Sequence, residues 1–205
     1  MSWNVLVVPE DPTYNGYILR PLCKRLLREA GRPNANIVVL AEPRVQGYAH
    51  AKRLLEDRIP SDWWHFELIL FIPDADGLAE NRKDEFKRLE QLAQQRERPI
   101  KLICCAAEQE LETWLLSGHP EKLKSLGWRW SEIRAEVSVK ERFFQPFLNQ
   151  HGDPASPSQG RERLMQEALA NFDGMKQRCP ELQELEARIR THIANLPKSK
   201  LNQPS

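Results

Sequence analysis

Short apolar runs alternate with longer segments of helical periodicity over the first 118 residues of the chain. The apolar runs are rich in β-branched residues and predict buried strands at residues 3–8, 36–41, 66–72 and 99–107. Apolar positions at helical spacing predict helices at residues 13–31, 46–59, 78–98 and 108–118. This alternation predicts an α/β fold in which helices flank a parallel sheet.

The pattern changes after residue 118, where the strand signals stop. Amphipathic helices are predicted at residues 161–178 and 181–195, and a polar loop rich in Pro, Gly and Ser precedes them at 150–160. We therefore expect an α/β core over residues 1–118 and a helical extension, packed on that core, over residues 119–196. The last stretch, residues 197–205, is expected to be a disordered tail.

Composition places the chain among soluble globular proteins. It has 205 residues, of which 40% are hydrophobic and 29% charged. No apolar run approaches the ~20 residues that cross a membrane, so we expect no membrane partner. The four cysteines include no C-x-x-C pair and are expected to be buried, reduced thiols of a cytoplasmic protein.

Acidic residues follow three of the four predicted strands. Glu10 follows the first strand, Asp74 and Asp76 follow the third, and the fourth leads into Glu108, Glu110 and Glu112. Parallel strands end at one edge of a sheet, and ligands bind there where the strand order reverses. Crowded carboxylates raise one another's pKa, and a hard divalent cation removes that cost. The spacing predicts a magnesium site, which manganese could also fill.

Each acidic group also has a simpler interpretation, because carboxylates favour helix N-termini. Taken alone, the Asp-x-Asp pair is a weak signal, and Glu108 and Glu112 could be a solvated helix face. The coincidence at three strand ends favours the metal site. Net charge is +1, and it divides into −2 over residues 1–120 and +3 over residues 121–205.

Three short motifs carry a resemblance to a known family. They are "EDPTY" at 10–14, "DADG" at 74–77 and "ELETWLL" at 110–116. Over residues 3–118 the chain resembles the Toprim family of topoisomerases, DnaG-type primases and overcoming-lysogenisation-defect nucleases, and most closely a branch associated with phage defence. The chain departs from that branch at Asp11, Tyr14 and Gly118, where the branch usually has glycine, glutamate and an acidic residue.

The resemblance implies a division of labour among these residues. Asp74 and Asp76 would hold one or two magnesium ions, and Glu10 would act as general acid/base or as a further ligand. Glu112, with Glu110, would complete a second metal site. The implied activity is phosphodiester cleavage by a nuclease of an anti-phage or toxin-like system, with a partner ATPase. The chain itself has no G-x-x-x-x-G-K-[ST] nucleotide motif.

Four basic residues downstream are candidates for contact with a nucleic-acid backbone. Lys140 and Arg142 lie in "VSVKERF", and Arg161 and Arg163 begin a predicted helix, whose N-terminal amides also favour phosphate. We expect Lys140, as a member of the catalytic group, and then Arg161 to matter most. The alternative is that all four are solvated surface bases.

Two other functions fit part of the pattern. A metal-dependent D-x-D sugar transferase would use Asp74 and Asp76 but leaves Glu10 and "ELETWLL" without a role. A non-catalytic Toprim-like subunit that binds a partner ATPase would explain the unusual "EDPTY" loop. A phosphatase of the haloacid-dehalogenase type would need its Asp-x-Asp after the first strand.

Overall fold

A four-stranded parallel sheet forms the centre of the protein, which confirms the predicted α/β fold class. The structure is a computed structural model and describes residues 3–59, 62–95 and 99–196. The strands are β1 (Asn4–Pro9), β2 (Asn36–Val39), β3 (Leu68–Ile72) and β4 (Lys101–Cys104). Their order is β2-β1-β3-β4, and every neighbouring pair is parallel. All four carboxyl ends therefore meet at one edge.

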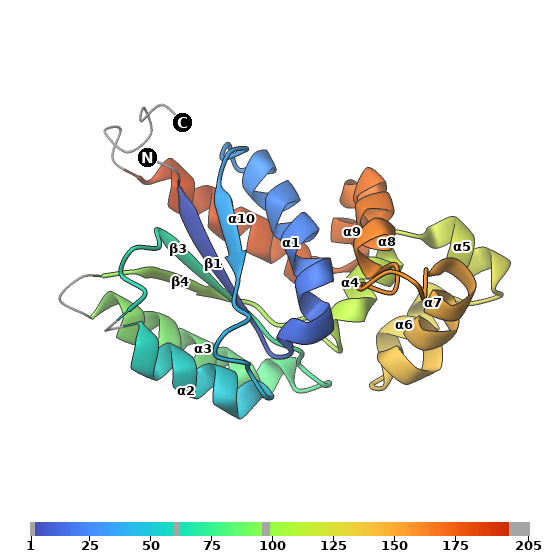
Figure 1. Cartoon of the computed structure of the whole chain (residues 1–205), viewed down its shortest axis with the longest axis horizontal. Helices are drawn as coiled ribbons and strands as arrows, with labels where there is room; N and C mark the ends of the chain where they lie inside the picture. Colours follow the sequence, from blue (N-terminus) through green and yellow to red (C-terminus); the bar gives the residue numbers. More distant parts are fainter. Residues whose placement is uncertain (1–2, 60–61, 96–98, 197–205) are drawn as a thin grey trace.

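Helices cover both faces of the sheet because the strands are buried on both sides. Side chains alternate along β1: Val5 and Val7 join one hydrophobic cluster, and Leu6 and Val8 join the other. Figure 1 shows α1 (Pro12–Glu29) and α10 (Pro180–Ala194) on one side of the sheet and α2 (Tyr48–Arg58) and α3 (Ala79–Gln94) on the other. This layering explains why the strands read as continuous apolar runs.

Local chemistry sets the two ends of α1. The Asp11 carboxylate accepts a hydrogen bond of 2.8 Å from the backbone N–H of Thr13, so Asp11 is the N-cap, and Pro12 opens the first turn. At the other end Gly31 adopts a φ of +87°, and the next N–H, that of Arg32, bonds the carbonyl of Leu27 at 2.7 Å. Gly31, directly after the C-cap Ala30, thus ends α1.

The helical extension contains more elements than the sequence predicts. After α4 (Leu111–Ser117) come α5 (Pro120–Ser125), α6 (Trp130–Ala135), the π-helical turn η1 (Lys140–Phe144) and α7 (Gln145–His151). These elements are too short to show a clear period. The helix predicted over 161–178 is interrupted: α8 (Arg161–Ala168) is joined to α9 (Phe172–Arg178) by a 3-10 turn, η2 (Leu169–Asn171).

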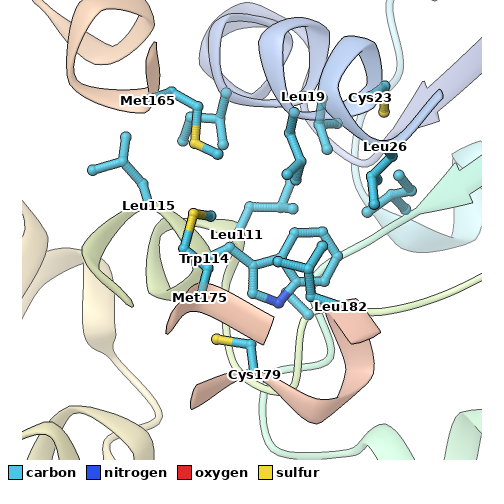
Figure 2. Close-up of a cluster of buried hydrophobic side chains, with 14 of the residues drawn as sticks. Leu19, Cys23, Leu26, Leu111, Trp114, Leu115, Met165, Met175, Cys179 and Leu182 are labelled. Carbon is cyan, nitrogen blue, oxygen red and sulfur yellow. The ribbon is translucent and has the colours of Figure 1, made fainter. Parts of the chain in front are cut away.

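One hydrophobic cluster runs from the sheet into the extension. Figure 2 shows the Trp114 and Leu111 side chains of α4 between α1 and the C-terminal helices. Trp114 is fully buried, and its indole N–H donates to Glu181 at 2.9 Å, so this side chain belongs to the core. The extension and the sheet thus share one core, while the predicted tail, 197–205, lies outside the described residues.

The cysteines agree in part with the prediction that they are buried thiols. Cys23, Cys104 and Cys179 are buried free thiols, and Cys105 is half-buried. Within the described residues no helix is both long and apolar enough to cross a membrane.

An ion pair closes the outer edge of β4. Glu90 of α3 accepts the Cys104 N–H at 2.8 Å, and Arg188 of α10 donates to the Cys104 carbonyl at 2.8 Å. The Arg188 guanidinium also bonds both oxygens of Glu90, at 2.6 and 2.7 Å. Together the two side chains satisfy the N–H and carbonyl of Cys104, which a fifth strand would otherwise pair, and they join the helices of opposite faces.

We predict that this pair stabilises the fold more than a surface pair does. A double-mutant cycle of Glu90→Gln and Arg188→Met, measured by urea unfolding, should give a coupling energy of about 1–2 kcal/mol. The matched control is the more exposed Glu56–Arg88 pair, also on the α2–α3 side, with an expected coupling below about 0.5 kcal/mol. Equal coupling in the two cycles would contradict the role given to the edge pair.

Candidate carboxylate site

The strand order reverses between β1 and β3, and the candidate site lies beyond these two strands. The chain runs from β1 outward to β2, then returns to β3 on the other side of β1. Glu10 follows β1 directly, and the loop with Asp74 and Asp76 follows β3. Parallel α/β sheets bind ligands at this position because the flanking loops diverge there.

The aspartate loop is held by the segment that follows β4. A bridge pairs Asp74 with Ala107, and the backbone N–H of Asp76 donates to the Gln109 carbonyl at 3.0 Å. Asp76 has a φ of +49°, a conformation that few residues other than glycine, asparagine and aspartate adopt. The pairing therefore fixes the loop in a form that leaves the Asp76 side chain 52% exposed.

Helix N-termini hold three of the predicted acids. Asp74 Oδ1 accepts the backbone N–H of Leu111, the first residue of α4, at 2.7 Å. Glu110 Oε2 accepts the backbone N–H of Lys140, the first residue of η1, at 2.5 Å. The backbone amides of Asp74 and of Tyr48, at the start of α2, lower the pKa of Glu10. The simpler interpretation, that these acids favour helix N-termini, thus accounts for part of their arrangement.

The same acids also repel one another, which helix capping alone does not explain. We call Glu10, Asp74, Asp76, Glu110 and Glu112 the carboxylate cluster. Burial first, and then the charges of Glu112, Glu10 and Glu110, raise the pKa of Asp74 well above its ordinary value. Burial followed by the charge of Asp76 raises the pKa of Glu10. The acids that follow β1, β3 and β4 therefore lie near enough to one another to act on one another's pKa.

The two glutamates of α4 are perturbed in the same direction. Burial is the main cause that raises the pKa of Glu110 to about 7. Glu112 is only 2% exposed, and its burial raises its pKa too. The positive charge of Lys140 opposes the shift at both residues. Lys140 thus lies beside the carboxylate cluster, where the sequence places it.

Arg82 of α3 is a member of the site that the sequence analysis misses. Its guanidinium donates to the carbonyl of Asp74 and lies 3.5 Å from Asp76 Oδ2. The Tyr48 ring stacks on it, with the ring centroid 4.0 Å from Cζ. Its side chain is 11% exposed. In the sequence Arg82 is one of many charged residues of α3. Only the packing of α3 against the loop with Asp74 and Asp76 shows that it belongs to the site.

Arg161 lies in the interior, which corrects the prediction of a surface contact to nucleic acid. Its side chain is 2% exposed and lies between the rings of Tyr14 (4.2 Å) and Phe144 (5.3 Å). It donates to Gln159 Oε1 at 2.7 Å, and its charge lowers the pKa of Glu112. A guanidinium enclosed in this way is a fixed counter-charge for the cluster.

The remaining predicted residues have other partners. Arg142 pairs with Glu136, and Arg163 pairs with Glu167 and donates to the His151 carbonyl at 2.5 Å. Arg142 and Arg163 are 67% and 52% exposed, so both can meet a ligand at the surface. Glu108, the first acid after the fourth strand, pairs with Arg134, which also holds Glu181 at 2.8 Å. Glu108 therefore belongs to a structural network.

The structure also accounts for the three departures from the phage-defence branch. Asp11 caps α1, and Tyr14 stacks on Arg161. A Cβ at Gly118 would lie 2.3 Å from the Cβ of Ala168 in α8, so only glycine fits between these helices. All three residues serve the packing of α1, α4 and α8.

A cavity of about 470 Å³ lies away from the cluster, between α3, β4 and α10. It is lined by Cys104, Cys105 and the Glu90–Arg188 pair. Burial raises the pKa of both thiols, which keeps them protonated and poorly nucleophilic at neutral pH. This cavity offers no activated group for catalysis.

Carboxylates are the ligand type that magnesium prefers. The cluster has five of them, and the neighbouring cations are Arg82, Lys140 and Arg161, so acids outnumber cations when all are ionised. Glu10 Oε2 is buried without a hydrogen-bond partner. Among the described residues, no three acidic, histidine or cysteine side chains already lie close enough to hold one ion. Binding would have to draw the side chains together.

Comparison with known proteins adds no relative to this picture: no family model, curated protein or solved structure matches the chain significantly. The function must therefore be argued from the site itself.

We predict that the cluster destabilises the metal-free fold at neutral pH. Glu110 has a folded pKa of about 7 against an ordinary value of 4.5. Its ionisation therefore costs stability in full above pH 7, and this cost disappears as the pH falls to 4.5. Glu110→Gln keeps an oxygen for the Lys140 N–H, and should raise the unfolding free energy at pH 8 by about 1 kcal/mol after discounting for partial exposure.

Urea unfolding at pH 8 and pH 4.5 measures this difference. The gain should vanish at the lower pH. Glu132→Gln is the control, because Arg129 holds the pKa of Glu132 below its ordinary value and neutralising it should give no gain. A Glu110→Gln variant that is no more stable than wild type at pH 8 would show that ionised Glu110 does not destabilise the fold.

Proposed function

We propose that the protein is a magnesium-dependent nuclease that cleaves phosphodiester bonds, with manganese as a substitute ion. The observation that carries this proposal is the group of five carboxylates beyond the switch point between β1 and β3, which raise one another's pKa. A structural role alone does not account for so many like charges in one place. The motif resemblance to Toprim proteins supports the choice of phosphodiester chemistry.

In this proposal Asp74, Asp76 and Glu112 hold the ion, and Glu110 adds a ligand at the start of α4. When bound, magnesium would stabilise the negative charge that develops on a phosphodiester during in-line displacement. Glu10 is suited to proton transfer because its Oε2 is buried without a hydrogen-bond partner and burial raises its pKa. The Lys140 ammonium, beside Glu110 and Glu112, would contact the phosphate and orient it.

The substrate is proposed to be nucleic acid, DNA or RNA. Support comes from the exposed bases Arg142 and Arg163 and from the charge balance, which turns positive after residue 120. A place in a bacterial anti-phage or toxin-like system, with a partner ATPase, rests on the resemblance alone. A non-catalytic subunit is the second candidate, favoured by Tyr14, which stacks on Arg161 at the position where the branch usually has an acid.

We predict that two charge-neutral variants abolish metal-dependent cleavage and leave the fold intact. Glu10→Gln removes the proton-transfer group, and Asp76→Asn removes a ligand while asparagine tolerates the φ of +49°. Each should lower the cleavage rate on the order of 100-fold or more. Manganese should raise the melting temperature of wild type and have less effect on Asp76→Asn.

Cleavage is measured on plasmid, single-stranded DNA, bulk RNA and tRNA, with and without manganese. Glu108→Gln is the matched control, since this acid of the same edge pairs with Arg134. Activity that survives both variants would refute the mechanism. A wild type that binds manganese but cleaves nothing, even with an ATPase encoded beside it, would favour the non-catalytic subunit.

Lys140→Ala tests the phosphate contact separately. The variant should bind substrate more weakly at low salt, and the slope of log affinity against log salt should fall by about 1. Arg163→Ala removes the same charge from a position paired with Glu167 and should change the slope less. Equal slopes for wild type and Lys140→Ala would exclude Lys140 as a phosphate contact.

A further inference from the structure

Arg82 is a cation supplied by the protein at the place where the proposed function puts a metal ion. Its guanidinium lies 3.5 Å from Asp76 Oδ2 and bonds the backbone carbonyl of Asp74. It also acts on Glu10, whose carboxyl group lies on the β1 side of the same switch point. One side chain of α3 therefore interacts with the acid that follows β1 and with the aspartate loop that follows β3.

The guanidinium is held in this position by a clamp on α2. The ring of Tyr48 stacks against it at 4.0 Å, and the Tyr48 hydroxyl donates to Glu85, which also pairs with Lys52. Tyr48 in turn packs on Phe71 of β3, with ring centroids 5.7 Å apart. Arg82 is thus pre-organised on the sheet, and the stacking energy adds to its attraction for the acids.

The side chains of Arg82 and Asp76 differ in their exposure to solvent. The Arg82 side chain is 11% exposed, whereas the Asp76 side chain is 52% exposed, and their separation of 3.5 Å is long for a charge-assisted hydrogen bond. A loose pair of this kind leaves the carboxylate oxygens open to a competing cation. The firmer Arg82 bond goes to the Asp74 carbonyl, which a metal ion does not need.

We infer that Arg82 is a resident counter-ion of the carboxylate cluster, which neutralises Asp76 and Glu10 in the metal-free protein and competes there with a divalent cation. Arg82 would reduce the repulsion among the acids in the metal-free protein. It would also lower the affinity of the cluster for a divalent ion. This inference depends on the proposed function in one respect, that the carboxylate cluster is the metal site. It makes Arg82 a positioning residue for affinity, with no direct part in bond cleavage.

Manganese affinity, measured by isothermal titration calorimetry on the full chain without substrate, tests this inference. Arg82→Met keeps an unbranched side chain that can pack on Tyr48 but removes the charge. It should bind manganese roughly tenfold more tightly than wild type, because an opposing cation within hydrogen-bonding range is gone. Arg82→Lys retains the charge and should stay within a factor of about two of wild type.

Arg88→Met is the matched control, since it removes the same charge from an exposed position on the same helix. It should leave manganese affinity unchanged. If Arg82→Met does not fold, Tyr48→Leu, which removes the stacking partner, is measured instead and should also tighten binding. In each case the added Asp76→Asn change should abolish the gain.

Affinity for manganese that is equal or weaker in Arg82→Met would overturn the inference and show that Arg82 organises the ligands. Absence of binding in both wild type and Arg82→Met would overturn it as well. Neither result depends on cleavage. A protein that shows the predicted tightening yet cleaves no nucleic acid would retain the counter-ion role and lose the nuclease proposal.

Discussion

Repulsion among carboxylates at one edge of the sheet is the constraint on which the rest of the structure depends. The parallel order β2-β1-β3-β4 puts the ends of β1 and β3 side by side, and acids follow both strands. A third acidic segment arrives after β4. Burial and mutual charge then raise the pKa values of four of these groups. A fold that keeps them together must supply compensation, and most of the surrounding elements do so.

The helical extension is part of that compensation. The N–H groups that begin α4 and η1 bind Asp74 and Glu110. The extension also carries two of the cations, Lys140 at the start of η1 and the enclosed Arg161 at the start of α8. The third, Arg82, comes from the opposite face of the sheet. Carboxylates outnumber cations at this edge, and a divalent ion would relieve their mutual repulsion, which is the physical argument for one.

The sequence predicts the parts of the site that follow from strand order and misses those that depend on tertiary contacts. Glu10 and Asp74 could be placed together because every strand of a parallel sheet ends at the same edge. The burial of Arg161 and the pairing of Glu108 with Arg134 could not, since both follow from how short helices after residue 118 pack. Arg82 is one of many charged residues of α3, and nothing in its spacing along the sequence distinguishes it.

The central claim is that a divalent ion binds at this edge of the sheet and offsets the negative charge of the carboxylates. Anomalous scattering from a manganese-soaked crystal tests it most directly, because the signal locates the ion without reference to activity. We predict a peak bounded by Asp74, Asp76 and Glu112, with the Arg82 guanidinium displaced from Asp76. Millimolar manganese that leaves this position empty, with Arg82 still against Asp76, would contradict the claim.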